Sequence, residues 1–131
     1  MSIQSINPYN NEIIAEYQKM SNSQIGSIIE RTAATQEIWS QESFTRRAEL
    51  LLALARRLRA DLEELARLMV REMGKPITAA RSEIEKCAWV CEYYAEHGEA
   101  HLAREVMETD ASFSAVEYRP LGVILAVMPW N

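Results

Sequence analysis

The sequence predicts an α/β fold that is mainly helical, with short strands before and after the helices. Apolar residues recur at helical spacing from about residue 22 to residue 96. Apolar and polar residues alternate near residues 13–18 and 110–119, and a wholly apolar run covers 123–128. Periods of about 3.6 and 2 residues are typical of helices and half-buried strands. A short apolar run bounded by breakers is typical of a strand buried on both faces in a parallel sheet.

Length and composition fit one ordinary globular domain. The 131 residues are 48% hydrophobic and 25% charged, close to the averages for such domains, so disorder is not expected. The net charge of −5 is spread over interleaved acidic and basic residues, which offers no basic stripe for nucleic acid. No apolar run reaches the roughly 18 to 20 residues of a membrane helix, and the N-terminus lacks a signal-peptide pattern. We therefore expect a cytoplasmic protein that binds neither nucleic acid nor a membrane.

The first twenty residues are expected to form strands joined by a turn. The turn residues Asn7, Pro8, Tyr9, Asn10 and Asn11 come directly before the alternating segment. Proline fixes its own φ angle, and asparagine tolerates the left-handed conformation that a tight reversal needs. The pattern predicts a β-hairpin or a pair of short edge strands.

Two helices are predicted next, each with a polar residue at its start. Ser21 and Gln24 have the spacing of a capping box, which favours a helix over about residues 22–40. A second helix is expected to begin near Ser43, because the apolar residues that follow keep alternating spacings of three and four.

A third helix is predicted after a bend near residues 60–61. Asp61 and Glu64 have capping-box spacing and open a clear apolar stripe that ends at Met73. One long helix with Asp61 on its surface would give much the same periodicity. The end of this helix is well defined, because Gly74 can take the left-handed position after a helix.

The fourth predicted helix covers about residues 78–96. Its apolar stripe is expected to be buried and contains both cysteines of the chain: Ala80, Ile84, Cys87, Ala88, Cys91, Tyr94 and Ala95. Buried cysteines in such a stripe usually act as small core residues.

No metal site is predicted. His97 and His101 are four residues apart, a spacing that can bind zinc from one helix face, but Gly98 between them is expected to interrupt the helix. Cys87 and Cys91 are not followed by the further Cys or His residues of a metal motif. We therefore expect structural or surface roles for all four side chains.

Only the end of the chain has a candidate for chemistry. The four glycines are too far apart for a phosphate-binding loop, and paired carboxylates such as Glu63 and Glu64 fit a solvated helix face. Trp130 and Asn131, in contrast, follow the apolar run 123–128, at the carboxyl end of the predicted strand, where ligands bind in open α/β sheets. An asparagine amide held there can stabilise an oxyanion, which is worth roughly 2.7 to 4 kcal/mol. A simple turn with a packed indole remains the alternative.

Several motifs, in order along nearly the whole chain, resemble the aldehyde dehydrogenase family. The residues 120–131, PLGVILAVMPWN, resemble the segment at which these enzymes enter their nucleotide-binding domain. The turn at Asn7 and Pro8 and the helix end at 71–76 resemble two further family motifs. Residues 93–98 and 117–122 are similar to those of bacterial succinate-semialdehyde dehydrogenases. The chain has Asn11 where the family turn usually has glycine, and Met128 where many members have isoleucine.

The resemblance implies the N-terminal portion of the aldehyde dehydrogenase fold, truncated at residue 131. Residues 1–20 would form N-terminal strands and a turn, and 21–104 the helical part of the nucleotide-binding domain. Residues 105–122 would form strands of an oligomerisation arm. Residues 123–131 would form the first strand of the nucleotide-binding sheet.

The resemblance also implies a function, namely NAD- or NADP-dependent oxidation of an aldehyde to a carboxylic acid through a cysteine thioester. Succinate semialdehyde is the implied substrate. Asn131 matches the family's oxyanion-stabilising asparagine. Val127, Met128, Pro129 and Trp130 match the segment that lines the nicotinamide end of the cofactor site.

The family's nucleophilic cysteine and general-base glutamate would lie beyond residue 131. Neither Cys87 nor Cys91 matches the nucleophile. We therefore expect the chain alone to be inactive and the complete enzyme to be a homodimer or homotetramer. The alternative is a non-catalytic helical interaction module derived from such an enzyme.

Overall fold

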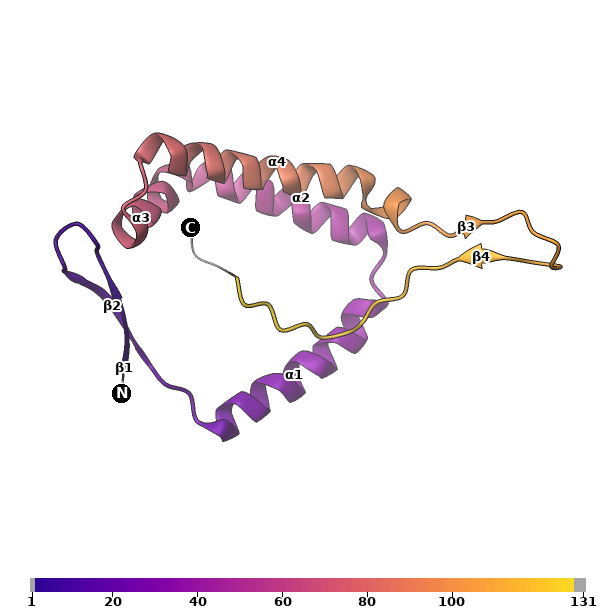
Figure 1. The fold of residues 1–131 in the computed structure, drawn as a ribbon, viewed down its shortest axis with the longest axis horizontal. Coiled ribbons are helices and arrows are strands. Elements are labelled where there is room, and N and C mark those ends of the chain that lie inside the picture. Colours follow the sequence, from indigo (N-terminus) through magenta and orange to yellow (C-terminus); the bar gives the residue numbers. More distant parts are fainter. Residues whose placement is uncertain (1, 129–131) are drawn as a thin grey trace.

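The computed structural model describes residues 2–128 and confirms a mainly helical chain with short strands (Figure 1). Four helices form the middle of the described chain, between two small antiparallel sheets of two strands each. In chain order the elements are β1 (Ser2–Ile6), β2 (Ile13–Gln18), α1 (Asn22–Ser40), α2 (Phe44–Ala60), α3 (Leu62–Met73), α4 (Ile77–His101), β3 (Glu105–Val106) and β4 (Ala115–Val116).

The core lies where three helices meet. Helices α2 and α4 run antiparallel side by side, and α3 lies at the end where α4 begins (Figure 1). Ala66, Ala80 and Ile84 are buried there. The small side chains of the two alanines let the helices approach closely. Larger side chains pack around them and are partly buried: Leu58, Leu62, Leu65, Met69, Val70 and Ile77. By contrast, α1 has no buried residue, so its apolar side chains lie open on the surface.

The predicted β-hairpin is confirmed. Strands β1 and β2 pair antiparallel, and the turn between them is held by the Asn11 N–H, which donates to the carbonyl oxygen of Asn7 at 2.9 Å. Asn11 has a φ of 60°, the left-handed conformation expected of it. The hairpin is tied to α3, because the hydroxyl of Ser5 donates to the Glu72 carboxylate at 2.7 Å.

The predicted starts of α1 and α2 are confirmed. The Gln24 N–H donates to Ser21 Oγ at 3.3 Å, and the Ser21 N–H donates to the Gln24 side chain at 2.8 Å, which completes the capping box. Ser43 accepts from the Arg46 N–H at 3.1 Å. These caps satisfy backbone N–H groups that have no partner inside the helix.

The bend between α2 and α3 is also confirmed, but the capping box at Asp61 is wrong. Asp61 has φ −97° and ψ 12°, whereas an N-cap residue normally has extended backbone angles. Its carboxylate forms an ion pair with Arg57 instead and makes no cap hydrogen bond. The break therefore depends on the backbone and on packing against α4.

Helix α4 is longer than predicted, and its cysteines are less buried. It continues through Gly98 to His101, because one glycine in a helix costs only about 1 kcal/mol relative to alanine. Its buried residues are Ala80, Ile84 and Ala88, whereas Cys87 is exposed and Cys91 is partly buried. Successive steps of four residues rotate by about 40° around the helix, so the contact face turns away from the cysteines. Tyr94 is also exposed, contrary to the prediction.

Near the end of the chain, the described residues contain less strand than the sequence predicts. The strand expected over 110–119 is limited to β4, whose Ala115 pairs with Val106 of β3. Residues 123–128 form no strand in the structure, and Gly122 directly before them has a left-handed φ of 95°. A buried parallel strand needs hydrogen-bonding neighbours, and among residues 2–128 no strand lies beside this segment.

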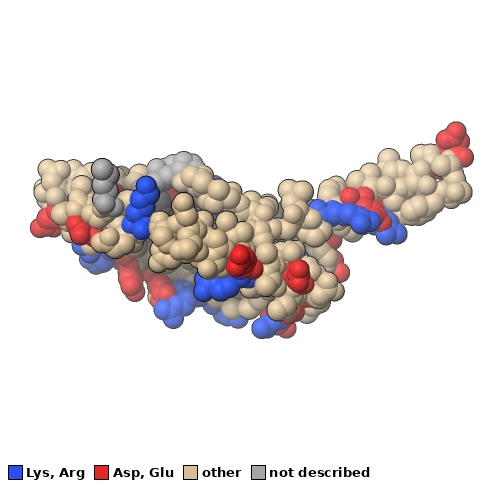
Figure 2. All heavy atoms as spheres, turned by 90° about the horizontal axis from the view of Figure 1, so that it is seen from below, with Lys and Arg blue, Asp and Glu red and all other residues tan. Residues whose placement is uncertain are grey.

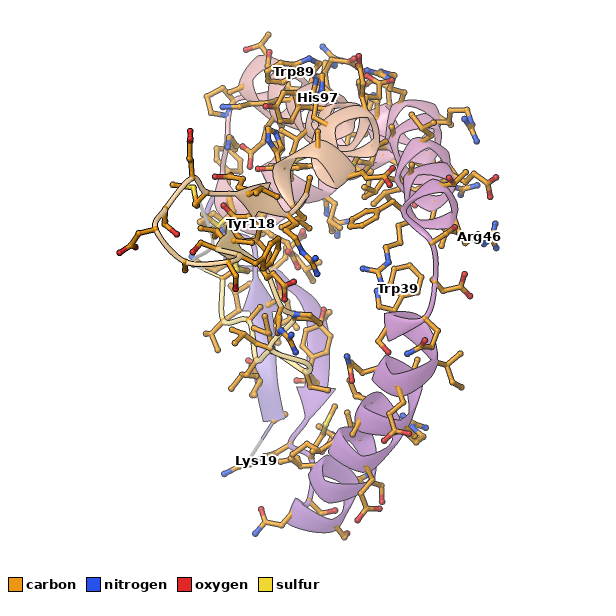
Figure 3. The ribbon with its side chains drawn as sticks, turned by 90° about the vertical axis from the view of Figure 1, so that its right-hand side faces the viewer. Lys19, Trp39, Arg46, Trp89, His97 and Tyr118 are labelled. Atoms are coloured by element: carbon orange, nitrogen blue, oxygen red, sulfur yellow. The ribbon has the colours of Figure 1, made fainter. Side chains whose placement is uncertain are left out.

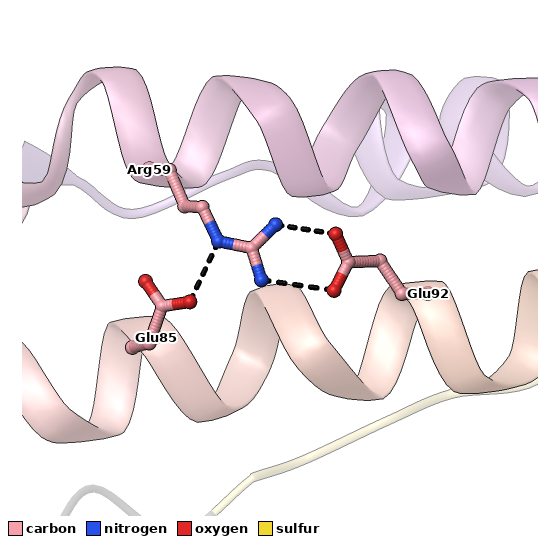
Figure 4. Close-up of polar contacts among 3 residues, drawn as sticks. All are labelled: Arg59, Glu85 and Glu92. Atoms are coloured by element: carbon pink, nitrogen blue, oxygen red, sulfur yellow. Dashed lines mark hydrogen bonds and ion pairs between the residues drawn. The ribbon is translucent and has the colours of Figure 1, made fainter.

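A network of charges joins α2 to α4 (Figure 4). Arg59 Nε donates to Glu85 Oε1 at 2.6 Å, and its Nη2 donates to Glu92 Oε2 at 2.9 Å, while Nη1 also contacts Glu92. These hydrogen bonds raise the pKa of Arg59, and the bond from Arg59 lowers the pKa of Glu92. The network thus links the end of α2 to the middle of α4.

We expect this network to make the stability of the protein depend on pH in the acidic range. Because folding lowers the pKa of Glu92 below its ordinary value of 4.5, its stabilisation is present above that value and is lost as the pH falls through the folded pKa. Between pH 7 and pH 3, the free energy of unfolding should therefore fall less in Arg59→Gln than in wild type. Urea unfolding at both pH values measures this change. Arg46→Gln removes the exposed pair with Glu49 and is the matched control. An acid dependence in Arg59→Gln equal to that of wild type would contradict the prediction.

Two glycines should respond oppositely to alanine. Gly74 has a φ of +67°, and a Cβ there would lie 3.3 Å from Pro8 Cγ, so Gly74→Ala should destabilise the protein by about 1 to 2 kcal/mol. Gly98 lies inside α4, and a Cβ there would have no atom within 4 Å apart from those of its chain neighbours and the adjacent helix backbone, so Gly98→Ala should stabilise the protein by about 0.5 to 1 kcal/mol. Urea unfolding of the two variants checks both signs, and a shift in the same direction for both would contradict the argument.

Candidate functional site

The predicted site residues lie at the end of the chain, where the structure describes only two of them. Val127 and Met128 are 83% and 78% exposed. Pro129, Trp130 and Asn131 lie outside the described residues. The assignment of these five residues to a cofactor site and an oxyanion site therefore stays a prediction.

The segment before them is apolar and open. Figure 1 shows residues 117–128 turning back from the β3–β4 arm toward the middle of the molecule. Ile124 and Leu125 are exposed together with Val127 and Met128. These apolar side chains suit contact with an apolar surface or a flat ring. No such surface among the described residues covers them.

The structure also has a hollow that the sequence did not indicate. It has a volume of about 450 Å³ and lies between the start of α2 and the end of α4. Its lining combines apolar and charged side chains: Phe44, Thr45, Arg47, Ala48, Leu51, Tyr94, Ala95, Glu96, Gly98, Glu99 and Leu102. None of the predicted site residues lies among them.

Arg47 is the main polar group of this hollow. Its Nη2 donates to the carbonyl oxygen of Trp39 at 3.0 Å, and its guanidinium lies over the rings of Trp39 and Phe44 (Figure 3 shows Trp39 beside the start of α2). Its Nε is buried and has no hydrogen-bond partner. Arg47 thus joins the end of α1 to α2. No periodicity in the sequence could reveal this contact, because it depends on the geometry of the connection.

The part of the chain that the structure describes has no metal centre with three or more side-chain ligands, and no cysteine in the hollow. No group of three or more His, Cys, Asp or Glu residues within 2–128 is arranged to hold a metal ion. Cys87 and Cys91 are free, and neither lines the hollow. No helix among these residues is long and apolar enough to cross a membrane.

The charged side chains are mixed on the surface. Figure 2 shows blue and red groups side by side over the helices, and the β3–β4 arm projecting away from them. Arg81 of α4 is paired with Glu63 of α3 at 2.7 Å, and Arg59 of α2 with two glutamates of α4. This pairing lowers the pKa of Glu63 and raises that of Arg81. The face shown offers no continuous patch of one sign.

Known proteins with similar sequences include succinate-semialdehyde dehydrogenases. "Succinate semialdehyde dehydrogenase [NAD(P)+] Sad" of Escherichia coli (strain K12) is 42% identical over 127 residues, which are 97% of this chain and 28% of that protein. A "Probable succinate-semialdehyde dehydrogenase [NADP(+)]" of Synechocystis sp. is 40% identical over 131 residues, all of this chain and 29% of that protein. The chain thus spans less than a third of the length of these relatives.

Solved structures agree on the fold. The succinic semialdehyde dehydrogenase of Streptococcus pyogenes, solved with NADP+, superposes with a TM-score of 0.80 and 30% identity over 86% of this chain and 25% of that one. Gox0499, whose structure addresses cofactor and substrate selection, gives a TM-score of 0.87 and 25% identity over 92% of this chain and 27% of that one. The four helices and short strands therefore match the N-terminal part of the aldehyde dehydrogenase fold. Since the model of the Aldehyde dehydrogenase family matches residues 1–131, this chain belongs to that family.

Proposed function

We propose that this chain is the N-terminal part of an NAD(P)-dependent aldehyde dehydrogenase that oxidises succinate semialdehyde to the acid. The observation that carries the proposal is the 40–42% identity to two bacterial succinate-semialdehyde dehydrogenases over nearly all of these residues. The family match over residues 1–131 supports the same reaction class. The chemistry would use a cysteine thioester, with the nucleophile and the general base supplied by the remainder of such an enzyme.

Asn131 is assigned the role of oxyanion donor. A carboxamide N–H aimed at the developing negative charge on the aldehyde oxygen lowers the barrier most when the donor is held rigidly beforehand. Its position directly after an apolar segment, Pro129 and Trp130 suits such a rigid arrangement. The side chain itself would undergo no covalent change.

Val127, Met128, Pro129 and Trp130 are assigned to the cofactor site. The two that the structure describes are apolar and exposed, which fits contact with the flat face of a nicotinamide ring. NAD or NADP, when bound, would accept the hydride from the substrate. The residues of this chain would place the ring and exclude water from it.

The parts of the chain receive the roles expected of the family. We assign residues 1–20 to the N-terminal strands, 21–104 to the helical part of the nucleotide-binding domain, and 105–122 to an oligomerisation arm. Residues 123–131 would become the first strand of the nucleotide-binding sheet once neighbouring strands are present. Val106 and Phe113 on the arm are largely exposed, which suits a contact between subunits of a homodimer or homotetramer.

The protein is proposed to work in the cytoplasm. Cys87 and Cys91 are free thiols, which suits a reducing compartment. The alternative, a non-catalytic helical module, fits less well. Helix α1 buries no residue, and an independent module would hide more of its apolar surface.

The test is an assay of the full product of the gene. Purified protein should reduce NAD or NADP when succinate semialdehyde is added, and the rate should exceed that with aldehydes that lack the carboxylate. The isolated 131-residue chain should show no turnover. A full gene product that extends no further than this chain, or one that leaves both cofactors unreduced, would overturn the proposal in favour of the interaction module.

A further inference from the structure

The continuation of α4 brings two histidines onto one helix face. His97 and His101 are four residues apart in an uninterrupted helix, so they are neighbours on adjacent turns. Their ring centroids lie 6.1 Å apart. The glycine between them, expected to end the helix, does not separate them.

Tyr93, one turn earlier, packs against both imidazole rings. Its ring centroid lies 4.6 Å from that of His97 and 5.7 Å from that of His101. Its hydroxyl oxygen lies 3.1 Å from Nε2 of His101. These contacts restrict the orientations of the two rings. Figure 3 shows His97 on α4, at the opposite end of the view from Lys19.

The surroundings of the pair favour a cation. Nε2 of His97 lies 3.9 Å from the carboxylate of Glu96, and the His97 side chain is 43% exposed, so a hydrated ion can reach it. Imidazole nitrogens are good ligands for Zn²⁺, Ni²⁺ and Cu²⁺. Two of them on adjacent helical turns can bind one ion together, as in helical zinc motifs with histidines at this spacing.

We propose that His97 and His101 form a two-imidazole site for a divalent late transition-metal ion, with water molecules in the remaining coordination positions. The site is independent of the proposed dehydrogenase chemistry, because it lies on α4 and uses none of the residues assigned to the cofactor site or the oxyanion site. One nitrogen of each ring would bind the same ion, at the 2.0 to 2.1 Å that is typical of zinc–imidazole bonds.

The two cysteines are the competing metal ligands. Cys87 and Cys91 are also four residues apart on α4, and thiolates bind soft metals. Ni²⁺ in a buffer that does not coordinate metals is therefore the probe, and Cys87→Ser/Cys91→Ser is the matched control. If the cysteines are the ligands, the Cys87→Ser/Cys91→Ser variant should lose Ni²⁺ binding. If the imidazoles are the ligands, this variant should keep it.

The experiment is a calorimetric titration of the full gene product with Ni²⁺. His97→Gln and His101→Gln should each bind one Ni²⁺ fewer per chain than wild type. If the site is weakened and not lost, its affinity for Ni²⁺ should fall on the order of tenfold or more. Ni²⁺ should raise the melting temperature of wild type and of the cysteine control, but not that of His101→Gln. Circular dichroism confirms that the glutamine variants keep their helices. Equal Ni²⁺ binding by wild type and both glutamine variants would overturn the site.

Tyr93 allows a second check of the ligand set. A metal ion on Nε2 of His101 would displace the nearby Tyr93 hydroxyl, since both use the same nitrogen. Tyr93→Phe should therefore bind Ni²⁺ at least as tightly as wild type. Loss of binding in Tyr93→Phe would indicate a phenolate ligand and overturn a site made of two imidazoles alone.

Discussion

Replacing Asn131 with alanine in the full gene product is expected to lower kcat for succinate semialdehyde on the order of 10²- to 10³-fold. Removing one oxyanion donor has effects of this size, because the donor stabilises charge that exists mainly in the transition state. The KM for NAD or NADP should change little, since the carboxamide is assigned to the substrate oxygen and not to the cofactor. Steady-state kinetics with each substrate varied in turn separates the two effects.

Asn22→Ala is the matched control for this variant. It removes the same carboxamide from the exposed first residue of α1 and should leave kcat close to that of wild type. A kcat for Asn131→Ala within a few-fold of wild type would remove Asn131 from its assigned role. A rise in the KM for the cofactor with unchanged kcat would move it to the cofactor site instead.

Replacing Ile84 with alanine is expected to lower the free energy of unfolding by about 2 to 5 kcal/mol, the usual range for a large-to-small change in a core. Ile84 is buried on α4 in the cluster with Ala66 and Ala80. Those two neighbours are fully buried alanines from different helices, so neither can extend to fill the cavity. Urea unfolding of the variant measures the loss.

Ile38→Ala is the matched control for the core variant. It removes the same atoms from a side chain of α1 that is 72% exposed, and alanine is the better helix former, so its effect should be small. Equal losses for Ile84→Ala and Ile38→Ala would show that the buried cluster does not hold the helices together.

The starts of α1 and α2 and the end of α3 were predictable because they depend on local interactions. Ser21 and Gln24 cap α1 through hydrogen bonds between residues three apart, and Ser43 caps α2 in the same way. Gly74 ends α3 through its own left-handed backbone angle. Each of these signals is complete within a few residues, so the rest of the fold cannot easily override it.

Predictions that depended on distant neighbours were less accurate. Residues 123–128 have the composition of a buried strand, but a strand is stable only when other strands pair with it. Cys87 fits the apolar stripe of α4 in sequence, yet the crossing of α4 with α2 and α3 decides which part of that stripe is covered. The hydrogen bonds from Arg59 to Glu85 and Glu92 depend on the same crossing and left no pattern in the sequence.

The candidate site was predicted from sequence motifs, and the structure added how exposed two of its residues are. The residues 120–131 and the other motifs, in their order along the chain, indicated the family to which this chain belongs. The structure shows Val127 and Met128 exposed at the end of an unpaired segment. Motifs of this kind are local in sequence, whereas a site is assembled from groups that only folding brings together.

By itself, the sequence determined the family, the starts of α1 and α2, the end of α3 and the hairpin, because caps, turns and motifs act over a few residues. Only the tertiary structure decided which faces of the helices are buried, how Arg59 joins α2 to α4, and that α4 continues past Gly98 to place His97 beside His101. Burial and pairing depend on which surfaces meet in space, and the periodicity of one segment does not specify its partners.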